Sequence, residues 1–167
     1  MNSLADRLDA INRAVGNTVR WFAVIMVTLQ FGVVLLRYVF GVSFIFLDEG
    51  VLYLHCALFM LGGGYTLLVD RHVRVDIFYS RWSRPSQARL NVFGATLALL
   101  PGSLITAWFC WPFVANSWIN LDGAISVGGI PASFLLKSLI PAFCILLAIQ
   151  GMACLIRDLV LARQADA

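Results

Sequence analysis

Four long runs of apolar residues follow one another along the chain and predict an all-α membrane protein. Each run is close to the roughly 20 residues that a helix needs to cross the hydrocarbon core of a bilayer. The first run, for example, carries no formal charge between Arg20 and Arg37. We expect a single membrane domain over residues 1–167, with four transmembrane helices over about 19–40, 49–69, 90–114 and 132–156.

A shorter pattern precedes the first run. The apolar residues Leu4, Leu8, Ile11 and Val15 recur there at helical spacing, and charged residues occupy the positions of the opposite face. This pattern predicts a short N-terminal amphipathic helix over residues 3–16 that begins at Ser3 and lies on the membrane surface. The alternative is a frayed polar tail.

Prolines predict where the helices bend, begin or end. Pro101, followed by a glycine, predicts a kink in the third run, and Pro112 predicts a stop near its end. The polar segment 116–123 is then expected to be an interfacial loop. Pro131 opens the fourth helix, where a proline is well tolerated, and Pro141 should bend that helix.

The basic residues are unevenly distributed between the two sides of this arrangement. Of the 12 Lys and Arg residues, all but two fall in the N-terminal arm, the loop between the second and third spans, or the C-terminal tail: Arg7, Arg13, Arg20, Arg71, Arg74, Arg81, Arg84, Arg89, Arg157 and Arg163. The other two are Arg37 and Lys137. The positive-inside rule therefore predicts that both termini are cytoplasmic, in a bacterial cytoplasmic (inner) membrane.

Composition agrees with lipid as the main solvent. The chain is 60% hydrophobic and 13% charged, with a mean hydropathy of +0.86. Soluble domains are about half apolar and about a quarter charged. The net charge of +3 is too small to indicate a nucleic-acid partner. We expect neither a disulfide framework nor a metal site, because the four cysteines lie in apolar runs without a CxxC pair. The first apolar run is too long for a signal peptide.

Charged residues at membrane depth are costly and therefore informative. Arg37 ends the first span, and Asp48 and Glu49 begin the second, only a ten-residue link later. We expect an ion pair or a hydrogen-bonded network that fixes the corner between the first two helices. Two alternatives are that these groups simply reach water, or that they form a proton or ion relay.

Lys137 lies six residues after Pro131, about 9 Å into the fourth helix. Its ammonium group either extends to the periplasmic surface or pairs with a carboxylate. The candidate partners are Asp48, Glu49 and Asp122.

Three glycines, Gly62, Gly63 and Gly64, lie inside the second span. Small residues let helix backbones approach closely in lipid, so we expect a helix contact there, within the chain or with a partner. Isolated polar residues such as Gln150 are expected to bond between helices. The charged segment after the second span includes His72, Arg74 and Asp76 and is either a water-facing anchor or a docking segment.

Several of these segments together resemble the small membrane subunit (DctQ-like) family of tripartite ATP-independent periplasmic (TRAP) transporters. The similarity covers roughly residues 19–156, and its most specific part is the run His72-Val73-Arg74-Val75-Asp76. The other similar segments are Arg37-Tyr38-Val39-Phe40, Phe46-Leu47-Asp48-Glu49, Gly62-Gly63-Gly64-Tyr65 and Gly129-Ile130-Pro131 with Pro141 and Gln150. Phe46 and Asp48 depart from the family pattern, which usually has tryptophan and glutamate there.

The resemblance implies a role. In that family, a periplasmic solute-binding protein delivers an organic anion to a permease of two subunits. The large subunit carries the substrate and sodium sites and moves, while the small subunit belongs to the static scaffold. The resemblance thus implies a chain that is not an enzyme and holds no cofactor. Its partners would be the large permease subunit, the binding protein and membrane lipid.

Three other functions are alternatives to this one, and particular residues argue against each. A membrane anchor of a redox complex would bind haem, but His55 and His72 are 17 residues apart, about 25 Å along a helix, and cannot ligate one iron. A four-helix thiol oxidoreductase needs periplasmic cysteines, which segments 38–48 and 115–130 lack. A small multidrug exporter needs a carboxylate deep in the first span, and residues 21–36 contain none.

Overall fold

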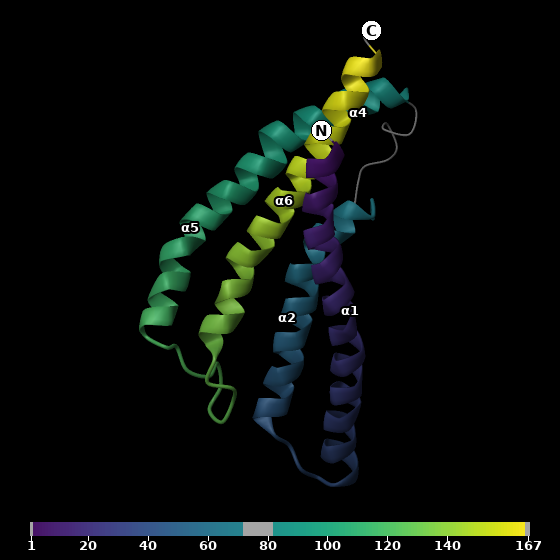
Figure 1. Cartoon of the computed structure of the whole chain (residues 1–167). Coiled ribbons are helices and arrows are strands. Elements are labelled where there is room, and N and C mark those ends of the chain that lie inside the picture. The colour runs from purple at the N-terminus through teal and green to yellow at the C-terminus, as the bar shows by residue number, and fades with distance from the viewer. Residues whose placement is uncertain (1, 72–81, 166–167) are drawn as a thin grey trace.

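The computed structural model describes residues 2–71 and 82–165, and this part of the chain is helical with short loops and no strand. It contains four stretches that are long and apolar enough to cross a membrane, Ser3–Val39, Ile45–Leu68, Ser86–Ile119 and Ser133–Ala162. The prediction of an all-α chain with four such helices is confirmed. Both ends of the chain lie at one end of the bundle, here called the termini end (Figure 1). The opposite end, with loops 40–44 and 120–132, is the loop end.

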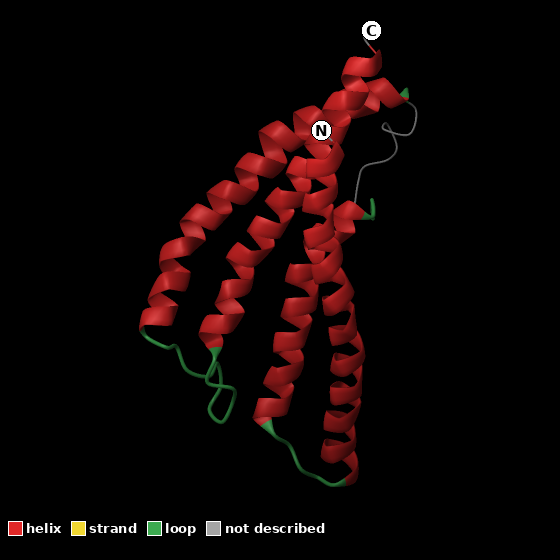
Figure 2. Ribbon diagram, in the orientation of Figure 1, coloured by secondary structure: helices red, strands yellow, loops and turns green. Residues whose placement is uncertain are grey.

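The central helix of the bundle is α6, which contacts each of the other α-helices. The elements are α1 (Asn2–Val39), α2 (Ile45–Leu68), α4 (Arg84–Gly94), a π-helical turn η1 (Ala95–Leu99), α5 (Leu100–Ile119) and α6 (Ser133–Ala165). Helices α1 and α2 form one hairpin, and α5 and α6 form another. The ribbons of the two hairpins are close at the termini end and diverge toward the loop end (Figures 1 and 2).

The first helix differs from the prediction. Residues 3–16 are helical, but they form the first turns of α1 and not a separate helix on the membrane surface. Ser3 lies inside the helix and does not begin it. The continuous helix buries one side against its neighbours, including Ala5, Val19 and Val33. A break after residue 16 would leave backbone groups without partners inside the bundle, whereas a continuous helix satisfies them.

The third crossing is bent where the sequence predicted it. Pro101 has no N–H to donate to the carbonyl of Leu97, and the π-helical turn Ala95–Leu99 lies directly before it. The chain changes direction between α4 and α5 (Figure 1). Leu99 fits against Gly151 of α6, where a Cβ atom would come within 2.2 Å of the Leu99 side chain.

Pro112 does not end the third crossing as predicted, because α5 continues to Ile119. A proline inside a helix removes one backbone hydrogen bond. Ending the helix in lipid would leave several backbone groups unpaired, which costs more. Pro141 likewise lies inside α6. Large apolar side chains cover the outer surface of α5, where Trp108 is 79% exposed, as expected for contact with lipid.

The glycines of α2 divide into two groups. A Cβ atom on Gly63 would lie 2.5 Å from the Phe143 ring of α6, and one on Gly64 would lie 2.2 Å from Asn12 Oδ1 of α1. Both glycines therefore allow close helix contacts within the chain. Gly62 faces open space, with no atom within 4 Å of its added Cβ.

These contacts predict different effects for the same substitution at neighbouring positions. Gly64→Ala should lower the free energy of unfolding by about 1–3 kcal/mol, because its methyl group overlaps Asn12 and the backbone of α6. Gly62→Ala is the matched control and should be neutral or stabilising by up to about 1 kcal/mol, since alanine favours helix and meets nothing. Equilibrium unfolding in detergent measures both. Equal effects would contradict this account of the packing.

Candidate functional site

Polar side chains gather in two clusters inside this apolar chain, one at each end of the bundle. The loop-end cluster consists of Arg37, Asp48, Glu49, Asp122 and Lys137 with their partners. The termini-end cluster consists of Asp6, Asp9, Asn12, Gln150 and Arg157. Each cluster joins elements that are distant in the sequence.

Glu49, near the start of α2, is the most buried residue of the loop-end cluster, with 5% of its surface exposed. Its two carboxylate oxygens accept hydrogen bonds from the backbone N–H groups of Ser126, at 2.8 Å, and Ile130, at 2.7 Å. Both donors lie in the loop between α5 and α6. A Cβ atom on Gly129 would lie 2.2 Å from the carboxylate, so only glycine permits this approach. Glu49 therefore joins the two hairpins at the loop end.

Arg37 and Asp48 form an ion pair at the α1–α2 corner. Arg37 Nη2 donates to Asp48 Oδ2 at 3.0 Å and to Ser43 Oγ at 3.2 Å. Arg37 lies in the last turn of α1 and Asp48 in the first turn of α2, where each charge also complements its helix dipole. Both side chains are well exposed, at 49% and 39%, so the pair itself contributes little stability.

Lys137 pairs with Asp122, one of the three carboxylates considered from the sequence. Its Nζ atom donates to Asp122 Oδ2 at 2.6 Å and lies 4.5 Å from the centre of the Phe113 ring. The Ser117 hydroxyl donates to the same carboxylate oxygen at 2.5 Å. These contacts close the α5–α6 hairpin. The pKa of the Asp122 carboxyl lies below its usual value, chiefly because Lys137 donates a hydrogen bond to it and secondarily because Ser117 does.

Gln150 of α6 is the centre of the termini-end cluster and is fully buried. Its Oε1 atom accepts from Asn12 Nδ2 at 3.0 Å, and its Nε2 atom donates to Asp9 Oδ1 at 3.0 Å. Asn12 Nδ2 also donates to the Leu146 carbonyl at 3.2 Å, while Asn12 Oδ1 lies against Gly64 of α2. Three helices, α1, α2 and α6, therefore meet at one polar group.

Arg157 completes this cluster two turns further along α6. It donates to Asp9 Oδ2 and, at 3.1 Å, to Asp6 Oδ1. Asp9 is only 6% exposed, and its charge is balanced by Arg157 and hydrogen-bonded by Gln150. A buried carboxylate is tolerated when it is paired in this way.

The polar face of residues 3–16, which a surface helix would turn toward water, lies partly inside the bundle. Asp9 and Asn12 are buried, whereas Leu4 and Ile11 are 56% and 44% exposed. An amphipathic helix can place its polar face toward water or toward polar partners. In lipid, the apolar face gains little by packing inward, because lipid tails are as apolar as its side chains. The available signal was the spacing of Gln150 and Arg157, seven residues apart on one face of α6.

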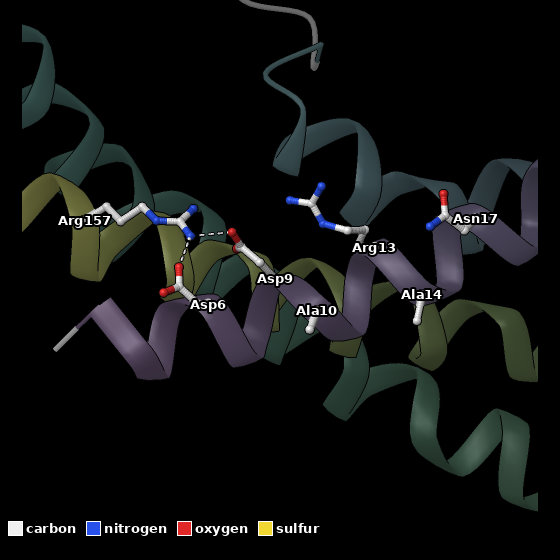
Figure 3. A pocket seen from close by; sticks show the side chains of 7 residues that line it. All are labelled: Asp6, Asp9, Ala10, Arg13, Ala14, Asn17 and Arg157. Atoms are coloured by element: carbon white, nitrogen blue, oxygen red, sulfur yellow. Dashed lines mark hydrogen bonds and ion pairs between the residues drawn. The ribbon is translucent and has the colours of Figure 1, made fainter.

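An open hollow of about 400 Å³ lies beside the termini-end cluster on the surface of α1 (Figure 3). Its walls are Asp6, Asp9, Ala10, Arg13, Ala14, Asn17 and Arg157. Arg157 is bonded to Asp6 and Asp9, whereas Figure 3 shows Arg13 and Asn17 without such contacts to the other drawn residues. The hollow therefore presents two polar side chains that have no ion pair or hydrogen bond within the described chain.

Three of the ten residues predicted from the sequence, His72, Arg74 and Asp76, lie outside the described residues. Within residues 2–71 and 82–165, no three His, Cys, Asp or Glu side chains form a group that could hold a metal ion. The four cysteines are free thiols. Apart from Asn12 Oδ1, which is buried without a hydrogen-bond partner, the polar groups described above for both clusters bind one another or the backbone.

Comparison with protein families matches residues 9–161 to the family described as tripartite ATP-independent periplasmic transporters, DctQ component. The match covers most of the chain. Neither a curated protein nor a solved structure matches it.

Glu49 gives a prediction for the loop end. In Glu49→Gln, the side-chain amide keeps one acceptor oxygen but turns an N–H group toward one of the two backbone donors. The free energy of unfolding should fall by about 1–3 kcal/mol, and the amides of Ser126 and Ile130 should exchange hydrogen faster. Asp48→Asn is the control, and should cost less than about 1 kcal/mol because its ion pair is exposed. Unchanged exchange at both amides would contradict the assigned role.

Gln150 gives a prediction for the termini end. A double-mutant cycle of Asn12→Leu and Gln150→Leu should show a coupling energy of about 0.6–2 kcal/mol, because the two amides bond each other in a buried site. Thermal or chemical unfolding in detergent provides the measurement. Thr18→Val serves as the control, because the Thr18 hydroxyl bonds only to the Ala14 carbonyl of its own helix. Strictly additive effects of the two leucine substitutions would refute the link.

Proposed function

Because this chain belongs to the DctQ family of tripartite ATP-independent periplasmic transporter components, we propose that it is the small permease subunit that scaffolds the large one. In this proposal, a periplasmic binding protein delivers an organic acid to the complex, and uptake is coupled to sodium. The substrate and sodium sites lie on the large subunit. The chain contributes no catalytic step and no cofactor.

The observation that carries the scaffold proposal is how the polar groups are used. Glu49 bonds to two backbone amides, Gln150 to two side chains, and Lys137 to Asp122. Each of these contacts joins one helix or hairpin to another. Groups used in this way hold helices in place, which is what a static subunit requires.

The proposed orientation places the termini end in the cytoplasm of a bacterial cell, across the inner membrane. Arg7, Arg13, Arg71, Arg89 and Arg157 belong to the segments at this end. Cytoplasmic segments of membrane proteins are enriched in such residues. The loop end, with Glu49 and loop 120–132, then faces the periplasm, from which the binding protein approaches.

Reconstitution tests the proposal. Proteoliposomes that contain the large subunit and this chain should take up an organic acid from its loaded binding protein when a sodium gradient is imposed. The matched controls omit this chain, or replace the sodium gradient with a potassium gradient. We expect uptake only with both subunits and with sodium. Full uptake by the large subunit alone would exclude the scaffold role, and equal uptake with potassium would exclude sodium coupling.

A further inference from the structure

Helix α1 has two faces with the same spacing, and only one of them is occupied within the chain. The inner face consists of Ala5, Asp9, Asn12, Gly16 and Val19, which are all buried. The positions alternate in steps of four and three, the spacing of a helix–helix seam. The same steps lead along an exposed outer stripe: Arg13, Asn17, Arg20, Val24, Val27, Phe31 and Val34.

The part of this outer stripe nearest the termini end is polar and consists of Arg13, Asn17 and Arg20. Arg20 lies at a depth where lipid would surround it. Gly16 packs against the Tyr65 ring. Tyr65 lies five residues, about 7.5 Å, before Asp70, the first charged residue after α2. Arg20 lies one further turn, about 6 Å, from Gly16 in the direction of the loop end. The level of Arg20 is thus about 14 Å from that of Asp70, near the middle of a hydrocarbon core of about 30 Å. This is deeper than the span predicted over about 19–40 implies, in which Arg20 lies at the cytoplasmic edge.

Contacts with α6 also place Arg20 inside the hydrocarbon core, at a level about 22 Å from that of Arg157. Asn12 bonds to Gln150, which lies seven residues, about 10 Å, before Arg157. Arg20 lies eight residues beyond Asn12, about another 12 Å into the bundle. An extended arginine side chain spans only about 7 Å, so extension toward the interface does not bring this charge to water.

Arg20 has no carboxylate partner within the described chain. The Arg20 guanidinium carbon lies 5.8 Å from the centre of the adjacent Trp21 ring, and Trp21 is itself 59% exposed. A charge at this depth is normally paired or faces protein. The outer surface of α5 is different, because no charged residue lies between Leu90 and Leu121 and its exposed side chains are apolar. That surface suits lipid, and the stripe of α1 does not.

We propose that the outer stripe of α1 is the surface against which the large permease subunit packs, with a carboxylate on one of its transmembrane helices bonded to Arg20. The inference rests on the proposed function and names the contact surface. The hollow of Figure 3 continues the stripe, because Arg13 and Asn17 belong to both. Ala10 and Ala14 on its wall allow a partner helix to come close.

Photo-crosslinking from the intact complex tests the surface. A photoreactive amino acid replaces Val27, which is 63% exposed on the stripe, or Ile105, which is 55% exposed on α5 and serves as the matched control. After irradiation of membranes, Val27 should give an adduct with the large subunit, and Ile105 should not. An adduct from Ile105 alone, an adduct between two copies of this chain, or the absence of any protein adduct from Val27 would overturn the inference.

Substitution of Arg20 tests the charge pair. Arg20→Leu should lower the recovery of the large subunit with the tagged chain at least about tenfold, because it leaves a buried carboxylate unpaired. Arg20→Lys should restore much of the recovery. Arg7→Leu, at an exposed position of α1 outside the stripe and the hollow, is the control and should leave recovery unchanged. Unfolding of the isolated variants verifies that Arg20→Leu still folds. Unchanged recovery with Arg20→Leu would overturn the pairing.

The same pull-down separates the two proposals. If the unaltered chain does not recover the large subunit, the scaffold function itself fails. If the unaltered chain recovers the large subunit, but Val27 gives no crosslink to it and Arg20→Leu leaves recovery unchanged, only the assignment of the surface fails.

Discussion

Lipid offers no hydrogen bonds, and the rest of this structure follows from that constraint. A polar group at depth can find hydrogen-bond partners only in protein, and two such groups decide how the hairpins are joined. Gln150 bonds α6 to α1 at the termini end, and Glu49 bonds α2 to the α5–α6 loop at the loop end. The apolar side chains between these two sites gain little from one another, because lipid is as apolar as they are.

Each of these polar links depends on a nearby glycine. A Cβ atom on Gly129 would overlap the Glu49 carboxylate, and one on Gly64 would overlap Asn12. Hydrogen bonds near 3 Å between a side chain and a neighbouring backbone need a close approach, and in helix contacts small residues provide it. The glycines and the polar residues therefore form one structural unit, and a substitution at either partner affects the same contact.

Hydropathy predicted the four membrane-crossing helices, and Pro101 predicted a bend, whereas Pro112 does not end α5 as predicted. The sequence did not predict which side of residues 3–16 faces inward, because the partners of Asp9 and Asn12 lie more than 130 residues away. Nor did it indicate that Glu49 would bond to loop amides, since backbone donors leave no signal in residue type. Three glycines in a row could not reveal that Gly62 faces outward, because the rotation of α2 decides it.

The spacing of the two links explains how so small a core can hold the helices in place. Asn12 meets α2 at Gly64, and Glu49 lies fifteen residues away, about 22 Å along the same helix. A single link would let the two hairpins pivot about it, whereas two links at opposite ends of α2 resist both pivoting and sliding. Breaking either one would expose a buried charge or amide to lipid, which costs more than separating apolar side chains there. Rigidity in this chain therefore comes from the placement of a few polar groups and not from a large apolar core, which suits a subunit that stays fixed while its partner moves.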